Sequence, residues 1–253
     1  ELPTLEAPVH TFAHLEHRLS SEKWEKIKTH LTGTGGITPS VFLIGAYAEI
    51  LAAWSRHQRF TINLTRFNRM PVHPEINEVV GDFTSLTLLE IDMKTGMTDS
   101  FTERCKKIQK QLLADLEHPL FCGVSVQREL GKYSQSQQGV MMPVVFTSSL
   151  GLQSNGKDHK NWFENRIYSS SETPQVWLDH QVTEEQGDLV LIWDYVKELF
   201  PERMIWEMFH AYVKLIESLC EHLENWEKPD IELVTIPRIQ EFEQENVNKT
   251  VIP

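Results

Sequence analysis

The chain has 253 residues, 40% of them hydrophobic, and a formal net charge of −12. This length suits one large globular unit with a buried core, and the acidic balance argues against non-specific binding of nucleic acid. No apolar run reaches the roughly eighteen residues expected of a membrane-spanning helix, and the acidic start lacks the features of a signal peptide.

The first half of the chain alternates between strand and helix patterns. Serine before the first helix and proline near the start of the second are typical N-terminal signals. The second helix is apolar on nearly every face, so we expect it to be deeply buried. In chain order the patterns predict a strand over 10–19, a helix capped by Ser20 or Ser21 and stopped near Gly33, a helix opened by Thr38-Pro39-Ser40, and strands over 60–65 and 82–91.

The second half of the chain continues with the same alternation and ends in a polar tail. An acidic segment containing one glycine separates two strand patterns and predicts a hairpin. In chain order we expect a helix over 100–116, a strand over 143–147, a surface loop over 153–160, hairpin strands over 175–180 and 189–194 joined by a turn over 183–188, and a helix over 201–223.

Strands and helices mixed at this spacing predict an α/β fold. We expect a two-layer sandwich in which helices pack against a largely antiparallel or mixed sheet. The chain divides into a Pro-rich connector over 1–9, a globular lobe over 10–228 and a polar linker over 229–253. Because it starts without Met and inside a connector, we interpret the chain as a piece of a longer polypeptide.

Several common catalytic motifs are missing from the sequence. It contains no P-loop, dinucleotide fingerprint, HExxH or GxSxG pattern. The histidine pairs His14/His17 and His57/His73 do not fall on one helix face beside a carboxylate, so we expect no metal site. The three cysteines are scattered singly without ligand spacing, which is typical of a protein of the reduced cytoplasm.

Four polar side chains stand in or just after apolar strand patterns, namely Asn63, Thr147, Ser148 and Asp179. Each has an ordinary explanation, since Asn and Asp form turns and Ser or Thr after a strand often caps a helix. Together they could instead position a thiol or hydroxyl and move protons during addition to a carbonyl and loss of water. The residues by themselves leave both interpretations open.

The strings around these residues resemble the signature motifs of the heterocyclization domains of non-ribosomal peptide synthetases, a branch of the condensation-domain family. The resemblance covers almost the whole chain, and the tail after residue 236 is similar to the linker before a following adenylation domain. Five motifs occur in the family's order: Leu2-Pro3-x-x-x-x-Pro8, Thr38-Pro39-Ser40 with Ile50-Leu51-Ala52-Ala53-Trp54, Gly81-Asp82-Phe83-Thr84-Ser85-Leu86-Thr87-Leu88-Leu89, Pro143-Val144-Val145-Phe146-Thr147-Ser148-Ser149-Leu150, and Thr173-Pro174-Gln175-Val176-Trp177-Leu178-Asp179 running on to Trp193-Asp194.

The resemblance implies the C-terminal lobe of a two-lobe domain with a chloramphenicol-acetyltransferase-like fold. It implies two reactions, amide formation with a carrier-bound Cys, Ser or Thr, and then cyclodehydration to a thiazoline or oxazoline. Asp179 would be the proton-transfer residue of the second reaction with Thr147 as its partner, and Asn63 and Ser148 would support cyclization. No cofactor would bind the chain directly, since both substrates would arrive on the phosphopantetheine arms of donor and acceptor peptidyl carrier proteins.

One family motif, DxxxxD, belongs to the N-terminal lobe and is absent from this chain. We therefore expect the chain alone to be inactive, and its partners to include the N-terminal lobe and the adjacent adenylation domain, without nucleic acid or membrane. We expect Asp82 and Asp194 to be structural, in turns. Two alternatives stay open: a non-catalytic docking lobe that binds carrier proteins, and an ordinary acyltransferase, which would need an HHxxxDG motif that this chain lacks.

Overall fold

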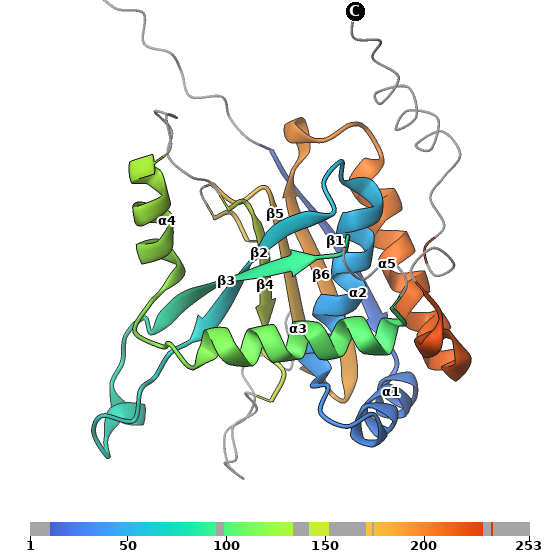
Figure 1. The fold of residues 1–253 in the computed structure, drawn as a ribbon, viewed down its shortest axis with the longest axis horizontal. Helices are drawn as coiled ribbons and strands as arrows, with labels where there is room; N and C mark the ends of the chain where they lie inside the picture. The colour runs from blue at the N-terminus through green and yellow to red at the C-terminus, as the bar shows by residue number, and fades with distance from the viewer. Residues whose placement is uncertain are drawn as a thin grey trace, which may run out of the picture.

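The computed structural model describes residues 11–94, 99–133, 142–151, 171–173, 175–229 and 234. The connector over 1–9, the loop expected over 153–160 and most of the linker over 229–253 lie outside the described residues. Figure 1 shows a twisted sheet accompanied by several helices, with helix α4 standing apart from the others.

The described residues form one six-stranded sheet with the strand order β1-β6-β5-β4-β2-β3 (Figure 1). Strand β4 pairs in parallel with both of its neighbours, β2 and β5, while the other pairs are antiparallel. The expected α/β fold with a mixed sheet is therefore confirmed. The strands are β1 (Phe12–Leu19), β2 (Arg59–Phe67), β3 (Thr84–Asp92), β4 (Val144–Ser148), β5 (Leu178–Glu185) and β6 (Asp188–Val196).

The first three helices begin at side-chain caps, of which the first two are expected from the sequence. The hydroxyls of Ser20, Thr38 and Ser100 each accept a hydrogen bond from the first turn of the helix that follows, which stabilises an otherwise unpaired backbone N–H. The α-helices are α1 (Ser21–Gly33), α2 (Pro39–Trp54), α3 (Phe101–Leu116), α4 (Gly123–Tyr133) and α5 (Met204–Glu221), and the short 3-10 helices are η1 (Ile76–Glu78), η2 (Lys197–Leu199) and η3 (Leu223–Glu227).

Helix α2 is the innermost helix, as its apolar pattern predicts. Eleven of its residues are buried, and it packs against helices α3 and α5 and, through Tyr47, against strands β5 and β6 of the sheet. At Gly45 the helix comes so close to α3 that an added Cβ would lie 2.6 Å from Cys105 Sγ, well inside van der Waals contact. One turn further on, Glu49 accepts a 2.5 Å hydrogen bond from Arg104 Nε of α3, so the same interface contains a buried ion pair.

The predicted hairpin is present, but its expected bounds were wrong. Strand β5 starts at Leu178 rather than residue 175, because Gln175 has a φ of 68° and the Val176 N–H closes a turn with Thr173 O. The turn contains only Gln186 and Gly187, both with positive φ, as a type I′ hairpin loop requires. Residues 183–185, which we expected in the turn, extend β5 instead.

Helix α4 was not predicted from the sequence. Its apolar residues Val124, Val126 and Leu130 remain 38–44% exposed, so the helix is only loosely attached to the hydrophobic core. The helix begins at Gly123, whose Cα approaches the side chains of Leu86 and Leu88 of β3 so closely that an added Cβ would lie 3.0–3.3 Å from them. Packing against the sheet edge, which no local pattern encodes, therefore positions this helix.

The start of the polar tail lies against the globular unit. Pro229 forms an isolated antiparallel bridge with Ser100, and Val234 packs against the hydrophobic core. All three cysteines, Cys105, Cys122 and Cys220, are free thiols. Within the described ranges, no helix is both long enough and apolar enough to cross a membrane.

The side chain of His180, in strand β5, is fully buried on the helix side of the sheet and is held neutral. Its Nε2 lies 2.9 Å from the Tyr212 hydroxyl and its Nδ1 lies 3.1 Å from Ile192 O. Burial lowers the pKa of His180 from 6.5 to about 3, and the hydrogen bonds that the imidazole makes to the backbone at Ile192 and Gln181 oppose the shift only in part. The folded chain therefore excludes a proton that the unfolded chain binds below pH 6.5.

Because the folded chain excludes this proton, its stability should decrease as the pH falls below 6.5. Between pH 6.5 and about 3 the unfolded state binds the extra proton, so the free energy of unfolding should fall by up to about 1.4 kcal/mol per pH unit as the pH falls. Above pH 6.5 the contribution is fully present. Chemical denaturation of the native chain and of His180→Phe across this range measures it, and the variant should have the shallower slope. Equal slopes would contradict the burial of a neutral imidazole.

Candidate active site

Five strands bring a row of residues into register across the sheet. Asn63 of β2 lies opposite Val145 of β4, which lies opposite Asp179 of β5. Asp179 in turn lies opposite Asp194 of β6, and Asp194 lies opposite His14 of β1. Because directly paired residues of neighbouring strands project to the same side of a sheet, these five side chains share one face.

That face is the one turned away from the helix layer. Phe146 and His180, each next in sequence to a member of the row, alternate to the opposite face and contact the ring of Tyr47 of α2. The sheet therefore separates an apolar core from a row of polar groups. The two faces differ because successive side chains along each strand point to opposite sides of the sheet.

Two oxygen atoms in this row are buried without a hydrogen bond. Asn63 and Asp179 are 6% and 7% exposed, and among the described residues neither Asn63 Oδ1 nor Asp179 Oδ1 has a partner. Leaving a buried acceptor unpaired costs roughly 1–3 kcal/mol. Such atoms are exceptions that need an explanation, and one explanation is a ligand that brings its own donors. Val145 lies between them and provides an apolar floor.

The other carboxylate oxygen of Asp179 belongs to a hydrogen-bonded network. Gln181 Nε2 donates to Asp179 Oδ2 at 2.9 Å and reaches Asp194 Oδ2 at 3.5 Å. Asp194 Oδ2 also accepts the Ser171 N–H at 3.0 Å, and Asp194 Oδ1 lies 2.7 Å from His14 Nδ1. Asp179 Oδ2 is thus hydrogen-bonded, while Asp179 Oδ1 is open, that is, without a hydrogen-bond partner among the described residues.

Burial raises the pKa of the Asp179 carboxyl, and the nearby charge of Asp194 raises it further. The nearby Ser171 side chain and the Gln181 amide act in the opposite direction, because polar donors close to the carboxylate stabilise it. A carboxyl whose pKa moves toward neutrality can both accept and donate a proton within one reaction cycle. Asp179 is therefore suited to proton transfer.

Thr147 lies on the same face as Asp179, whereas Ser148 does not. Thr147 is two residues beyond Val145 and pairs with Gln181, which makes it a diagonal neighbour of Asp179. Ser148 alternates to the helix side, where its hydroxyl lies 2.8 Å from that of Ser40 in the first turn of α2. The structure thus brings together Asn63, Thr147 and Asp179 and leaves Ser148 outside the group.

Of the two aspartates that we expected in turns, one lies there. Asp82 Oδ1 accepts the Thr84 N–H at 2.8 Å before β3 begins, as expected. Asp194 lies inside strand β6 beside Asp179, so the expectation of a turn was wrong for it. Sequence reasoning also missed Gln181 and His14, although the polar alternation of residues 179 and 181 was a usable signal.

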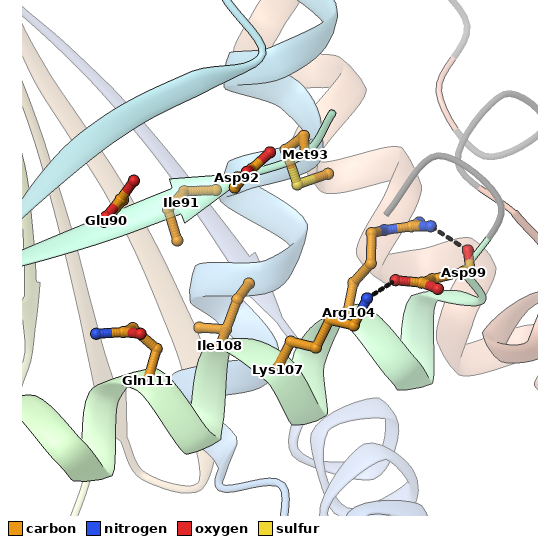
Figure 2. Close-up of a pocket in the computed structure, with 9 residues that line it drawn as sticks. All are labelled: Glu90, Ile91, Asp92, Met93, Asp99, Arg104, Lys107, Ile108 and Gln111. Atoms are coloured by element: carbon orange, nitrogen blue, oxygen red, sulfur yellow. Dashed lines mark hydrogen bonds and ion pairs between the residues drawn. The ribbon is translucent and has the colours of Figure 1, made fainter. Parts of the chain in front are cut away.

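A hollow of about 290 Å³ lies elsewhere, between the edge strand β3 and helix α3 (Figure 2). Figure 2 shows Arg104 and Lys107 both reaching Asp99, where Arg104 donates to the backbone carbonyl and Lys107 to the carboxylate. Three strand positions separate β3 from β5 in the sheet, and the hollow contains none of the four candidate residues. In the described part of the chain, no group of three or more metal-binding side chains is placed to hold an ion.

Comparison with protein families matches the Condensation domain over residues 2–236 of the chain. Pyochelin synthetase PchF of Pseudomonas aeruginosa is 38% identical over 219 residues, which are 87% of this chain and 12% of that protein. Phenyloxazoline synthase MbtB of Mycolicibacterium paratuberculosis is 34% identical over 219 residues, which are 86% of this chain and 18% of that protein. The chain thus spans less than a fifth of the length of either relative.

A solved structure of the EpoB cyclization-docking bidomain from Sorangium cellulosum, part of a non-ribosomal peptide synthetase, has the same fold. It superposes with a TM-score of 0.74 at 38% identity, over 90% of this chain and 44% of that one. The mixed sheet and its packed helices are therefore found in a solved relative whose chain is about twice as long as the matched part.

Proposed function

The chain belongs to the condensation-domain family, in its cyclization branch, and we propose that it supplies the ring-closing groups of an active site that makes thiazolines or oxazolines. It acts as the C-terminal lobe of a heterocyclization domain in a non-ribosomal peptide synthetase. The observation that carries this proposal is the row in which Asp179, buried with one open oxygen, lies two strands from the open oxygen of Asn63.

In ring closure, Asp179 moves two protons to one oxygen. Its carboxylate first takes the proton of the substrate thiol or hydroxyl as that atom bonds to the amide carbon, and returns it to the former carbonyl oxygen. It then takes the proton of the amide nitrogen as the C=N bond forms, and gives it to the departing hydroxyl, which leaves as water. The raised pKa of the Asp179 carboxyl favours both the uptake and the return.

The neighbours of Asp179 hold the reacting group in this proposal. Asn63 Oδ1 accepts a hydrogen bond from a donor of the substrate, such as the amide N–H, and Val145 forms the floor beneath it. The Thr147 hydroxyl can donate to the oxygen that leaves. Ser148 has the weakest support among the four predicted residues, since its hydroxyl contacts Ser40 at the start of α2.

The partners follow from the same proposal. Donor and acceptor peptidyl carrier proteins deliver both substrates on phosphopantetheine arms, and the N-terminal lobe completes the site, so the chain alone is inactive. Large apolar side chains that are 74–98% exposed on the β2–β3 connection and around α4 are suited to contact with other parts of a longer protein, namely Val72, Val80, Leu120, Phe121 and Tyr133. The adjacent adenylation domain follows the linker, and the three free thiols fit a cytoplasmic enzyme.

The complete synthetase that contains this chain tests the proposal when it is supplied with loaded donor and acceptor carrier proteins. Mass spectrometry of the released product should show condensation with the loss of one further water. Condensed product that keeps this water would favour amide formation alone. An assembled enzyme that forms no product at all, although it binds the carrier proteins, would support the docking-lobe alternative.

A further inference from the structure

Asp179 is held by Gln181, whose amide nitrogen also reaches Asp194. Gln181 lies two residues along β5, so its side chain projects to the same face. Its amide Nε2 donates to Asp179 Oδ2 at 2.9 Å, while Asp194 Oδ2 lies 3.5 Å from the same nitrogen. A single amide group therefore bridges two buried carboxyl groups from adjacent strands.

Asp194 is anchored from the side of the sheet edge. Its Oδ1 lies 2.7 Å from His14 Nδ1 on β1, and its Oδ2 accepts the Ser171 N–H at 3.0 Å. With 3% exposure it is almost excluded from solvent. Fixed from both oxygens, Asp194 cannot turn away from Gln181 without breaking hydrogen bonds, and Gln181 in turn fixes the rotation of the Asp179 carboxyl group.

We propose that Gln181 and Asp194, with His14 behind them, are positioning residues for ring closure, which hold Asp179 Oδ2 so that Oδ1 faces the reacting thiol or hydroxyl. This inference rests on the proposed function, since it deepens the role of Asp179. An untethered carboxyl group would sample orientations in which Oδ1 no longer meets the substrate, and a displacement of about 1 Å can cost about a hundredfold in rate. Amide formation, which does not use Asp179 in the proposed mechanism, should be unaffected.

The two positioning residues differ in their electrostatic action on Asp179. Gln181 stabilises the carboxylate by donating a hydrogen bond, whereas the charge of Asp194 disfavours the carboxylate, so the two move the pKa of Asp179 in opposite directions. Other ionisable groups near the network are His14 and Glu16 of β1, on the far side of Asp194, and the hydroxyl of Tyr47 behind the sheet. None of them is changed in the variants below.

Ring formation by Gln181→Met and Asp194→Asn in the complete synthetase tests the inference. Both substitutions keep side-chain size, and both should lower the ratio of ring product to uncyclised amide about tenfold or more, with amide formation within about twofold of the native enzyme. The pH profile of kcat/KM for ring formation should move its acidic limb to higher pH in Gln181→Met and to lower pH in Asp194→Asn. Loss of packing alone would not give opposite shifts.

Thr183→Val is the matched control, because Thr183 lies on the same strand and face, about 13 Å beyond Asp179 at about 3.3 Å per residue. It should leave both the product ratio and the pH profile unchanged. An unchanged ratio in the two test variants, or limbs that do not separate, would overturn the positioning role while the proposed function stands. A native enzyme that makes amide but never ring would overturn the proposed function and this inference with it.

Discussion

Asp179→Ala in the complete synthetase should form the amide at a near-native rate and accumulate it without closing the ring. General acid–base groups contribute typically 10²–10⁴-fold, so ring formation should fall by about that factor. Asp179 is 7% exposed, and burial raises the pKa of its carboxyl. Water that reaches this buried position in the variant would therefore be a poor substitute for the carboxyl in proton transfer. Single-turnover mass spectrometry separates the two products, because the ring product is lighter by one water.

Two further variants sharpen this result. Asp179→Asn keeps the shape of the side chain and can still accept hydrogen bonds, but it cannot take up the proton, so it should be as defective as alanine. Thr147→Val, at the diagonal position, should slow ring closure less than either, since it removes one hydroxyl donor. Native ring formation in Asp179→Asn would exclude proton transfer by this residue.

Arg104→Met should lower the free energy of unfolding of the chain by about 3–5 kcal/mol. Arg104 is 4% exposed and Glu49 1% exposed, and Arg104 Nε donates to Glu49 Oε1 at 2.5 Å between helices α3 and α2. Removing the guanidinium leaves the carboxylate in the core without its charged partner, and a buried uncompensated charge is costly. Urea denaturation with an unchanged m-value measures the loss.

A double-mutant cycle distinguishes this explanation from lost packing. Replacing both partners, Glu49→Met with Arg104→Met, should destabilise the chain far less than the sum of the single changes, because no buried charge is left. Lys107→Met is the control on the same helix, since the Lys107 side chain is 61% exposed and its ion pair with Asp99 should contribute no more than about 1 kcal/mol. Additive losses in the double variant would contradict a coupled pair.

Local signals in the sequence were sufficient for the elements that carry their own caps or turns. Thr38 before Pro39 predicts the start of α2, and Ser100, where the helix over 100–116 was expected to begin, is the N-cap of α3. Helix α4 lacked such a signal because its position depends on contact with Leu86 and Leu88 of β3. The hairpin turn was expected to begin too early because Glu184 and Glu185 read as turn residues, whereas both lie inside β5, where they accept hydrogen bonds from Trp24 and Arg18.

The site was predictable in its types of residue but not in its arrangement. Asn63 and Asp179 are 116 positions apart in the sequence, and only the parallel pairing of β4 with both β2 and β5 aligns them. Such long-range register cannot be read from a local pattern. Strand alternation could, however, have separated Thr147 from Ser148, because consecutive residues of one strand face opposite sides.

The most direct measurement supplies the synthetase with an amide that has already been condensed, as an N-acyl-cysteinyl thioester on its acceptor carrier protein. This substrate bypasses amide formation and reports ring closure alone, as the appearance of a species lighter by one water. The native enzyme should convert it, and Asp179→Ala should not, although both bind the loaded carrier protein equally. Conversion by both enzymes at the same rate would contradict the assignment of ring closure to this face of the sheet.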